Sequence, residues 1–214
     1  MISSTIKRLN DRRDSAEEIG EDAGFTLIEL MVVLLILAIL LAIAIPTFLG
    51  VTKSANDRAA QSNLNTALVN AKSIFQNNSQ SYALAGGVGT LSQTANNASL
   101  QGSLSTAEPN LQFTTSTVTN GGTGSPAVSV AIAADGNGVV LVEQAKGTGN
   151  CWYIVDNAVN ETVAAGGTPY TNLGSSNALN PGTWYGKYTS TPAPTSCSTT
   201  VPTGTTFQAS GFGS

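Results

Sequence analysis

The feature that most constrains this chain is an unbroken apolar run from Leu30 to Ile45. Between Phe25 and Leu49 the one ionisable side chain is Glu29. About 25 residues in a helix span roughly 37 Å, which is enough to cross the ~30 Å hydrocarbon core of a bilayer. A helix of a soluble core would carry polar residues on one face, and this run has none. We therefore predict a membrane-spanning helix over residues 25–49.

The segment before the run lacks the order of an ordinary secretory signal. Such a signal places basic residues first, then a short apolar stretch, then a small-residue cleavage site. Here residues 1–24 are polar and charged, and Gly24 comes before the run. After it come Pro46-Thr47-Phe48-Leu49-Gly50, with no A-x-A pattern. A cut at Gly24 would leave the apolar helix on the mature protein.

Basic residues near the ends of the run predict its orientation in a membrane. Four lie before it and two soon after it: Lys7, Arg8, Arg12 and Arg13, against Lys53 and Arg58. Because an excess of Lys and Arg marks the cytoplasmic side, we predict a cytoplasmic N-terminus before assembly and an external C-terminal part.

The stretch Gly24-Phe25-Thr26-Leu27-Ile28-Glu29 before a long apolar helix resembles the class III signal of type IV prepilins and related pseudopilins. Gly24, Phe25 and Glu29 each stand where that signal has them. Residues 45–50 and 57–62 are similar to pilins of Gram-positive, actinobacterial type. The resemblance covers roughly residues 20–82.

This resemblance implies how the N-terminus is processed. In the family, a membrane-embedded peptidase cuts after the glycine and methylates the new amino terminus. The implied scissile bond is Gly24–Phe25, the N-methylated residue is Phe25, and the leader is residues 1–24. That leader is net acidic, with four basic and six acidic side chains, whereas many family leaders are short and basic. The other implied partners are a cytoplasmic ATPase, an assembly platform and further copies of the chain.

Glu29 is the candidate assembly residue. A carboxylate at the mouth of a membrane helix is costly unless a positive group meets it. Cleavage would create that group at Phe25, and a helix N-terminus also favours a negative side chain. The resemblance implies that Glu29 of an incoming subunit neutralises the terminal amine of the previous one and sets the axial register. A pair within one chain and a Glu that reaches lipid headgroups are the alternatives.

The apolar helix is expected to continue as a stem. Pro46 removes one backbone donor, which predicts a kink that a membrane helix tolerates. Beyond it, apolar residues recur at three- and four-residue spacing and predict an amphipathic helix over residues 50–78. The predicted stripe is Ala55, Ala59, Leu64, Ala67, Leu68, Ala71, Ile74 and Phe75.

The rest of the chain predicts a small sheet. Residues 79–110 are rich in Gly, Ser, Asn and Ala without a clear period and are expected to form a connecting loop. Within residues 111–214, strands are predicted at 111–118, 128–132, 139–143 and 151–155, joined by turns at 135–138 and 147–150. Irregular loops with at most a short edge strand are expected from residue 157 onward. The predicted fold class is α+β: a long helical stem packed against an antiparallel head, as in type IV pilins.

Cys151 and Cys197 are the two cysteines of the chain, and the predicted topology places both outside the cytoplasm. A disulfide is their simplest use there. It would close a loop of about 47 residues and stabilise the fold by roughly 4 kcal/mol in the chain-entropy estimate. Pilins similar to this chain often carry a C-terminal disulfide loop, and two free thiols are the alternative. With zero histidines and no C-x-x-C, no metal site is predicted.

No catalytic constellation is present in the sequence, and no cofactor is predicted. The absence of histidine removes the commonest general base. Asp135-Gly136-Asn137-Gly138 has part of the pattern of a calcium loop, but a hairpin turn explains it better. Without the leader, five basic and seven acidic side chains remain, so no nucleic-acid-binding surface is predicted.

The predicted function is therefore that of a structural subunit, a major pilin. It would enter the cell membrane first and form an extracellular type IV pilus afterwards. The alternatives are a pseudopilin of a type II secretion system, a competence-type pilin for DNA uptake, and a single-pass membrane protein with an adhesive ectodomain.

Overall fold

The computed structural model describes residues 25–84, 93–119, 127–162, 167–170, 172–173 and 177–212. The chain divides into two compact units, Met1–Leu49 and Gly50–Ser214. Helix α2 (Leu27–Asn77) contributes residues to both of them. The predicted leader and Gly24 lie outside the described residues. We call the second unit the head unit.

The first unit, as far as it is described, is the apolar part of α2. Its side chains from Phe25 to Leu49 are all exposed. In the described part of the chain, α2 is the helix long and apolar enough to cross a membrane, with a window of mean hydropathy 3.2 that is 0% buried. Pro46 lies inside α2, and the Thr47 hydroxyl donates to the carbonyls of Ile43 (3.1 Å) and Ala44 (2.9 Å). Such back-bonding is a common way to satisfy carbonyls near a membrane proline, and the kink itself stays a prediction.

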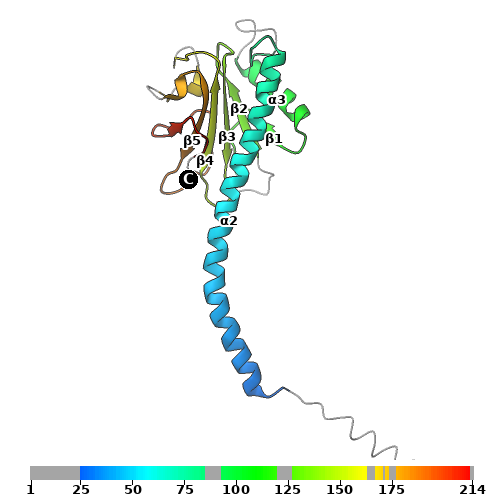
Figure 1. Ribbon diagram of the computed structural model, residues 1–214, viewed down its shortest axis with the longest axis vertical. Helices are drawn as coiled ribbons and strands as arrows, with labels where there is room; N and C mark the ends of the chain where they lie inside the picture. Colours follow the sequence, from blue (N-terminus) through cyan, green and yellow to red (C-terminus); the bar gives the residue numbers. More distant parts are fainter. Residues whose placement is uncertain are drawn as a thin grey trace, which may run out of the picture. The chain divides into compact units, whose positions relative to one another are not determined.

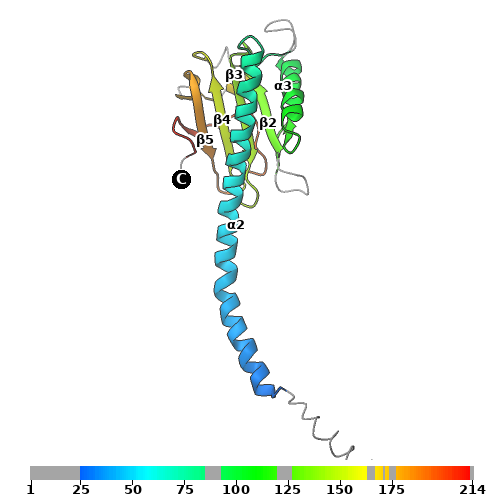
Figure 2. The same cartoon turned by 45° about the vertical axis from the view of Figure 1, so that its right-hand side comes forward.

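The head unit contains a six-stranded sheet whose strands are hydrogen-bonded in sequence order. The central strands run side by side in Figures 1 and 2. The strands are β1 (Gln112–Thr114), β2 (Ala127–Ile132), β3 (Gly138–Gln144), β4 (Cys151–Asn157), β5 (Gly182–Tyr188) and β6 (Thr206–Gln208). Two short 3₁₀ helices, η1 (Thr168–Tyr170) and η2 (Asn177–Leu179), lie between β4 and β5.

One face of the sheet is covered by two helices. The second half of α2 crosses this face, and α3 (Gln93–Ala107) packs on β1 and β2 (Figure 2). The buried stripe of α2 meets apolar side chains of β2, β3 and β4 in one core. That stripe is Ala60, Leu64, Ala67, Leu68 and Ala71. The predicted stripe was wrong at Ala55 and Ala59, which are exposed because this part of α2 meets the β3–β4 turn through polar side chains.

The other face of the sheet is covered by parts of the chain that follow β4, which we call the C-terminal segment. Tyr170, Leu173 and Ala178 pack there with Val140 and Tyr153 in a second core. Every residue of β3 and β4 is buried, because the sheet has apolar cover on both sides. The α+β prediction is confirmed, and residues from 157 onward contribute more to the core than expected.

Helix α3 corrects the prediction of a connecting loop over residues 79–110. Its apolar stripe is narrow, with Leu100 and Leu104 buried one turn apart. Side-chain bonds to strand backbone fix the helix instead: the Gln93 amide donates to the Ile132 carbonyl (2.8 Å), and the Ile132 N–H donates to Asn97 (2.8 Å). The composition of residues 93–107 did not predict this helix, because tertiary hydrogen bonds rather than helix propensity hold it in place.

Two strand predictions also need correction. β1 is shorter than the predicted strand 111–118 and pairs with β2 in parallel, so the sheet is not a pure antiparallel meander. β5 is a full seven-residue strand between β4 and β6, where a short edge strand at most was expected. Its Gly186 lies under the Phe207 ring of β6, where a Cβ would overlap the ring. This strand was not predicted from the sequence pattern, because it contains glycine and its flanks are rich in Thr.

Candidate functional site

The start of α2 is built as a reciprocal cap. The Thr26 N–H and the Thr26 hydroxyl both donate to Glu29 Oε2, each at 2.9 Å. The Glu29 N–H donates in return to Thr26 Oγ1 at 3.2 Å. This is the capping box, in which Thr and a Glu three residues later satisfy each other's exposed amides. The sequence analysis did not identify the role of Thr26, although T-x-x-E is the spacing of a capping box.

The cap directs the Glu29 carboxylate back toward the beginning of the helix. It reaches the backbone N–H of Thr26, the residue that follows Phe25. Phe25, the predicted N-methylated residue, and Glu29, the predicted assembly residue, are therefore about one turn apart, whereas Gly24 lies outside the described residues. A new amine on Phe25 would arise beside this carboxylate.

Beyond Glu29 the helix exposes apolar side chains on every side. Phe25 is 88% exposed, and Leu30 and Ile45 are each more than half exposed. A helix that is apolar all round is stable only when lipid tails or other apolar helices cover it. The first unit, as far as it is described, therefore presents an apolar surface that needs such a cover.

In the head unit, Asp57 ties α2 to the turn between β3 and β4. Its Oδ1 accepts hydrogen bonds from the Thr148 hydroxyl (2.8 Å), the Asn150 amide (3.2 Å) and the Trp152 indole (3.0 Å). One carboxylate thus satisfies donors from three residues that are about 90 positions away in sequence. Sequence reasoning did not single out Asp57, because its partners are brought together only by the fold.

A second polar connection lies farther along α2. Lys72 Nζ forms an ion pair with Asp156 at 2.9 Å and donates to the Thr183 hydroxyl at 2.7 Å. Thr183 donates to Asp156 Oδ1, and the Tyr82 hydroxyl donates to Asp156 Oδ2 at 2.7 Å. Burial, followed by the Asp156 charge, raises the pKa of Tyr82, so the phenol stays protonated as a donor.

A buried carboxyl group lies between these two connections. Glu143 on β3 is 2% exposed and accepts one hydrogen bond, from the Asn63 amide of α2 at 3.0 Å. Its second oxygen has no hydrogen-bond partner. Burial raises the pKa of Glu143 to about 8, and the Asn63 bond lowers it only in part. Near neutral pH the folded chain therefore carries mostly a neutral acid at the helix–sheet interface.

The segment 135–138 forms the predicted turn between β2 and β3. Asp135 accepts hydrogen bonds from the Asn137 N–H (3.0 Å) and the Asn137 amide (2.9 Å), and Gly136 has a φ of 77°. Nearby Glu161 is 4% exposed, and neither of its oxygens accepts a hydrogen bond. Burial, then the Asp135 charge, raises the pKa of Glu161 to about 7. Among the described residues, no group of three or more His, Cys, Asp or Glu is placed to hold a metal ion.

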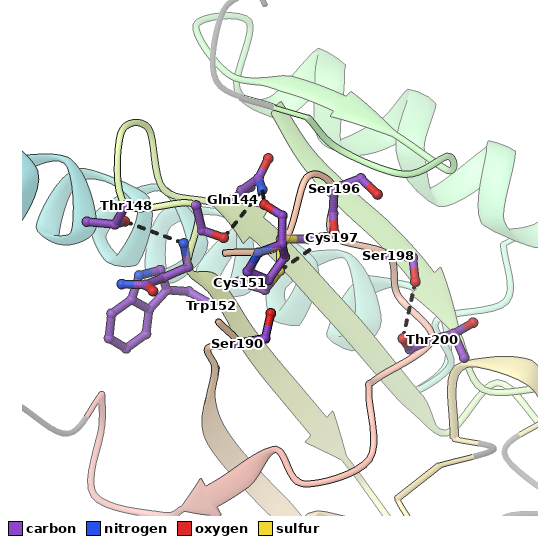
Figure 3. The surroundings of a disulfide bond; sticks show 12 residues. Gln144, Thr148, Cys151, Trp152, Ser190, Ser196, Cys197, Ser198 and Thr200 are labelled. Atoms are coloured by element: carbon purple, nitrogen blue, oxygen red, sulfur yellow. Dashed lines mark hydrogen bonds between the residues drawn. A yellow bond between two sulfur atoms is a disulfide. The ribbon is translucent and has the colours of Figure 1, made fainter. Parts of the chain in front are cut away.

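The two cysteines form a disulfide, Cys151–Cys197, as predicted. Figure 3 shows it at the start of β4, with Gln144 of β3 close by. The Gln144 amide donates to the Pro194 carbonyl at 2.6 Å, and Cys197 exchanges two backbone hydrogen bonds with Val118. The bridge therefore fastens the C-terminal segment to β4 and to the chain after β1. It lies in the head unit and belongs to the scaffold.

Comparison with known proteins concerns the N-terminal part of the chain. Residues 21–45 match the sequence model of the prokaryotic N-terminal methylation motif. A stretch of 59 residues is 46% identical to PilA4, the major component of the type IV wide pilus of Thermus thermophilus. The match covers 28% of this chain and 44% of that protein, so it spans less than half of the relative. No solved structure matches the chain.

These similarities agree with the cap at Thr26 and Glu29 and with the exposed apolar helix. The chain carries the N-terminal methylation motif of type IV prepilins and, over about a quarter of its length, is similar to a type IV pilin.

Proposed function

We propose that this chain is a major pilin, a structural subunit that polymerises through its apolar helix into an extracellular type IV pilus. The observation that carries the proposal is the capped Glu29 at the start of a helix exposed on every side. Such a surface needs an apolar partner, and the methylation motif supports a second copy as that partner. The likeness to actinobacterial pilins stays an expectation.

The proposed sequence of events starts with the chain in the membrane, its N-terminus in the cytoplasm. A prepilin peptidase hydrolyses the Gly24–Phe25 bond and methylates the Phe25 amine. The platform and ATPase then move the subunit into the growing fibre. Before assembly, Glu29 is satisfied by Thr26 of its own chain. On assembly, it exchanges this partner for the terminal amine of the preceding subunit, which fixes the axial register.

Glu29 variants test this proposal, and Thr26 offers a matched control. Glu29→Gln removes the charge and Glu29→Val removes all hydrogen bonding, whereas Thr26→Val removes the hydroxyl half of the cap and keeps the carboxylate. We expect wild-type cells to carry long surface fibres. Both Glu29 variants should enter the membrane in normal amounts but yield at least roughly tenfold fewer fibres, since an unmatched charge in low dielectric costs several kcal/mol. Thr26→Val should still form fibres.

The outcomes separate the role of the charge from that of the cap. A normal fibre yield from Glu29→Val rejects the register role. An equal loss in Thr26→Val assigns the defect to helix capping instead. The major-pilin proposal itself is rejected if wild-type cells carry no fibres. This holds whether or not deletion of the gene causes a defect in secretion or DNA uptake.

A further inference from the structure

The charged side chains of the head unit are segregated along the strands. Three exposed cations, Lys53, Lys146 and Lys187, lie at the end where β3 finishes and β4 begins. Lys53 is close to this β3–β4 turn, because a Cβ on Gly147 would lie 4.0 Å from its Cγ. Lys187 lies over the Trp152 ring at 4.9 Å. We call these three residues the basic end; the carboxylate beside them that is not buried is Asp57.

The opposite end of the same strands carries carboxylates. Asp135 precedes β3, Asp156 is near the end of β4, and Glu161 follows β4. The cation among them is Lys72, which is paired with Asp156. Glu161 is buried beside Asp135, and burial, followed by the Asp135 charge, raises its pKa. We call Asp135, Asp156 and Glu161 the acidic end.

The remaining charged residues of the head unit do not change the net charge of either end. By sequence they are Arg58, Glu108 and Glu143. Arg58 and Glu108, of opposite sign, line the same groove beside α2, and Glu143 is buried. The basic end therefore has two cations in excess over Asp57. The acidic end has one carboxylate in excess, half-buried Asp135, because Asp156 is paired with Lys72 and Glu161, like Glu143, is buried with a raised pKa.

The two ends are too far apart to neutralise each other within one molecule. From Asp57 to Lys72 the helix rises about 22 Å, and the seven residues of β3 span about 20 Å. At physiological ionic strength the Debye length is about 8 Å, so exposed charges at this separation are screened from each other. Each end must find its opposite charge in solvent ions or in another molecule.

We infer that the basic end of one copy docks on the acidic end of a second copy of this chain. This inference rests on the proposed polymer and names the axial contact between its head units. A contact between unlike ends is heterologous, so it repeats in one direction and generates a filament. A two-fold contact would bring like ends together, which charge repulsion opposes. Exposed Lys146 of one copy would meet half-buried Asp135, the most accessible carboxylate of the acidic end, on the next copy.

Charge reversal in full-length subunits tests the contact. Lys146→Glu and Asp135→Lys each place like charges across the interface, so each should lower the yield of sheared fibres by roughly tenfold or more. The chain that carries both changes has unlike charges again at every contact and should recover most of the wild-type yield. Ala98→Glu is the control, because Ala98 is exposed on α3 between the two ends. It should assemble normally.

Asp135 also shapes its turn, so a second acidic-end variant keeps it in place. Ala134→Lys adds a cation at the exposed neighbouring residue and should lower the yield in the same direction. Normal fibre yields from both single reversals, while wild-type cells carry fibres, overturn the inference and leave the major-pilin proposal intact. The inference is also overturned if the subunit with both reversals accumulates in the cell but the fibre yield does not recover. A loss of Lys146→Glu from the membrane pool alone, with an unchanged polymerised fraction, would assign the basic end to anionic lipid headgroups and overturn it too.

Discussion

At the scale of single residues, polar side chains hold together parts of the chain that the apolar pattern alone does not connect. Thr26 and Glu29 close the exposed start of α2, and Asp57 satisfies donors from residues far along the sequence. A carboxylate with good partners is stable where it lies. Glu143 differs, because burial leaves one of its oxygens without a partner. Its protonation therefore couples the helix–sheet contact to pH.

Glu143 predicts how stability changes with pH. Its pKa is about 8 in the folded chain and near 4.3 in an unfolded one, so the folded state holds a proton that the unfolded state has released. Stability should then fall as pH rises from about 4.5 to about 8, by up to several kcal/mol. Glu161 acts in the same direction but only up to about pH 7.

Glu143→Gln should remove the fall between pH 7 and 8 and make the chain more stable than wild type at pH 9. Urea unfolding of the full chain in detergent micelles, followed by the fluorescence of buried Trp152, measures it. Parallel curves for the two proteins across this range would show that Glu143 is ionised in the folded state and would contradict the prediction.

At the scale of elements, the head unit is held by connections between segments that are distant in sequence. Asp57 fixes the second half of α2 to the β3–β4 turn, and Lys72 fixes it near the other end of the sheet. The disulfide fastens the C-terminal segment over the face that α2 does not cover. These connections make one folded unit of elements with modest apolar stripes.

Loss of Asp57 should weaken the attachment of α2. Asp57→Ala leaves the Thr148, Asn150 and Trp152 donors without their acceptor, at a cost of about 2–3 kcal/mol. Its neighbour Arg58 is exposed and serves as the control, since Arg58→Ala should change stability by less than about 0.5 kcal/mol. Hydrogen exchange should show faster opening of the β3–β4 turn in Asp57→Ala. Equal stability of the two variants would refute this anchoring role.

Removal of the disulfide should act through the C-terminal segment. Replacing Cys151 and Cys197 together by Ser removes a cross-link over 46 positions and should lower the free energy of unfolding by about 4 kcal/mol. Val118 should lose exchange protection, because it pairs with Cys197 through backbone hydrogen bonds. A loss below about 1 kcal/mol, with Val118 still protected, would mean that packing and the Gln144 bond to Pro194 hold the segment without the bridge.

The sequence predicts those elements whose own residues carry a strong pattern. The apolar run, the β2–β3 hairpin around Asp135-Gly136-Asn137-Gly138 and the disulfide were all predictable, because each depends on local composition or on two cysteines alone. Helix α3 and strand β5 were not, because Gln93 bonds to β2, and Phe207 packs over Gly186, only after the chain has folded. The Asp57 connection was hidden for the same reason.

At the scale of the whole molecule, the two units differ in what they require. The first exposes an apolar helix that needs lipid or other helices, and the head unit is a folded body with oppositely charged ends. The proposed subunit, which is first held in a membrane and then polymerises, would meet both requirements in turn. The proposed assembly depends on one chemical event, the release of a charged amine at Phe25 beside the Glu29 carboxylate.

The most direct measurement is intact and N-terminal peptide mass spectrometry of material sheared from the cell surface. We predict a chain that begins at Phe25, carries a methyl group on its terminal amine and contains the intact Cys151–Cys197 bridge. Surface material that begins at Met1, with residues 1–24 still attached, would contradict the account and leave a tethered ectodomain in its place.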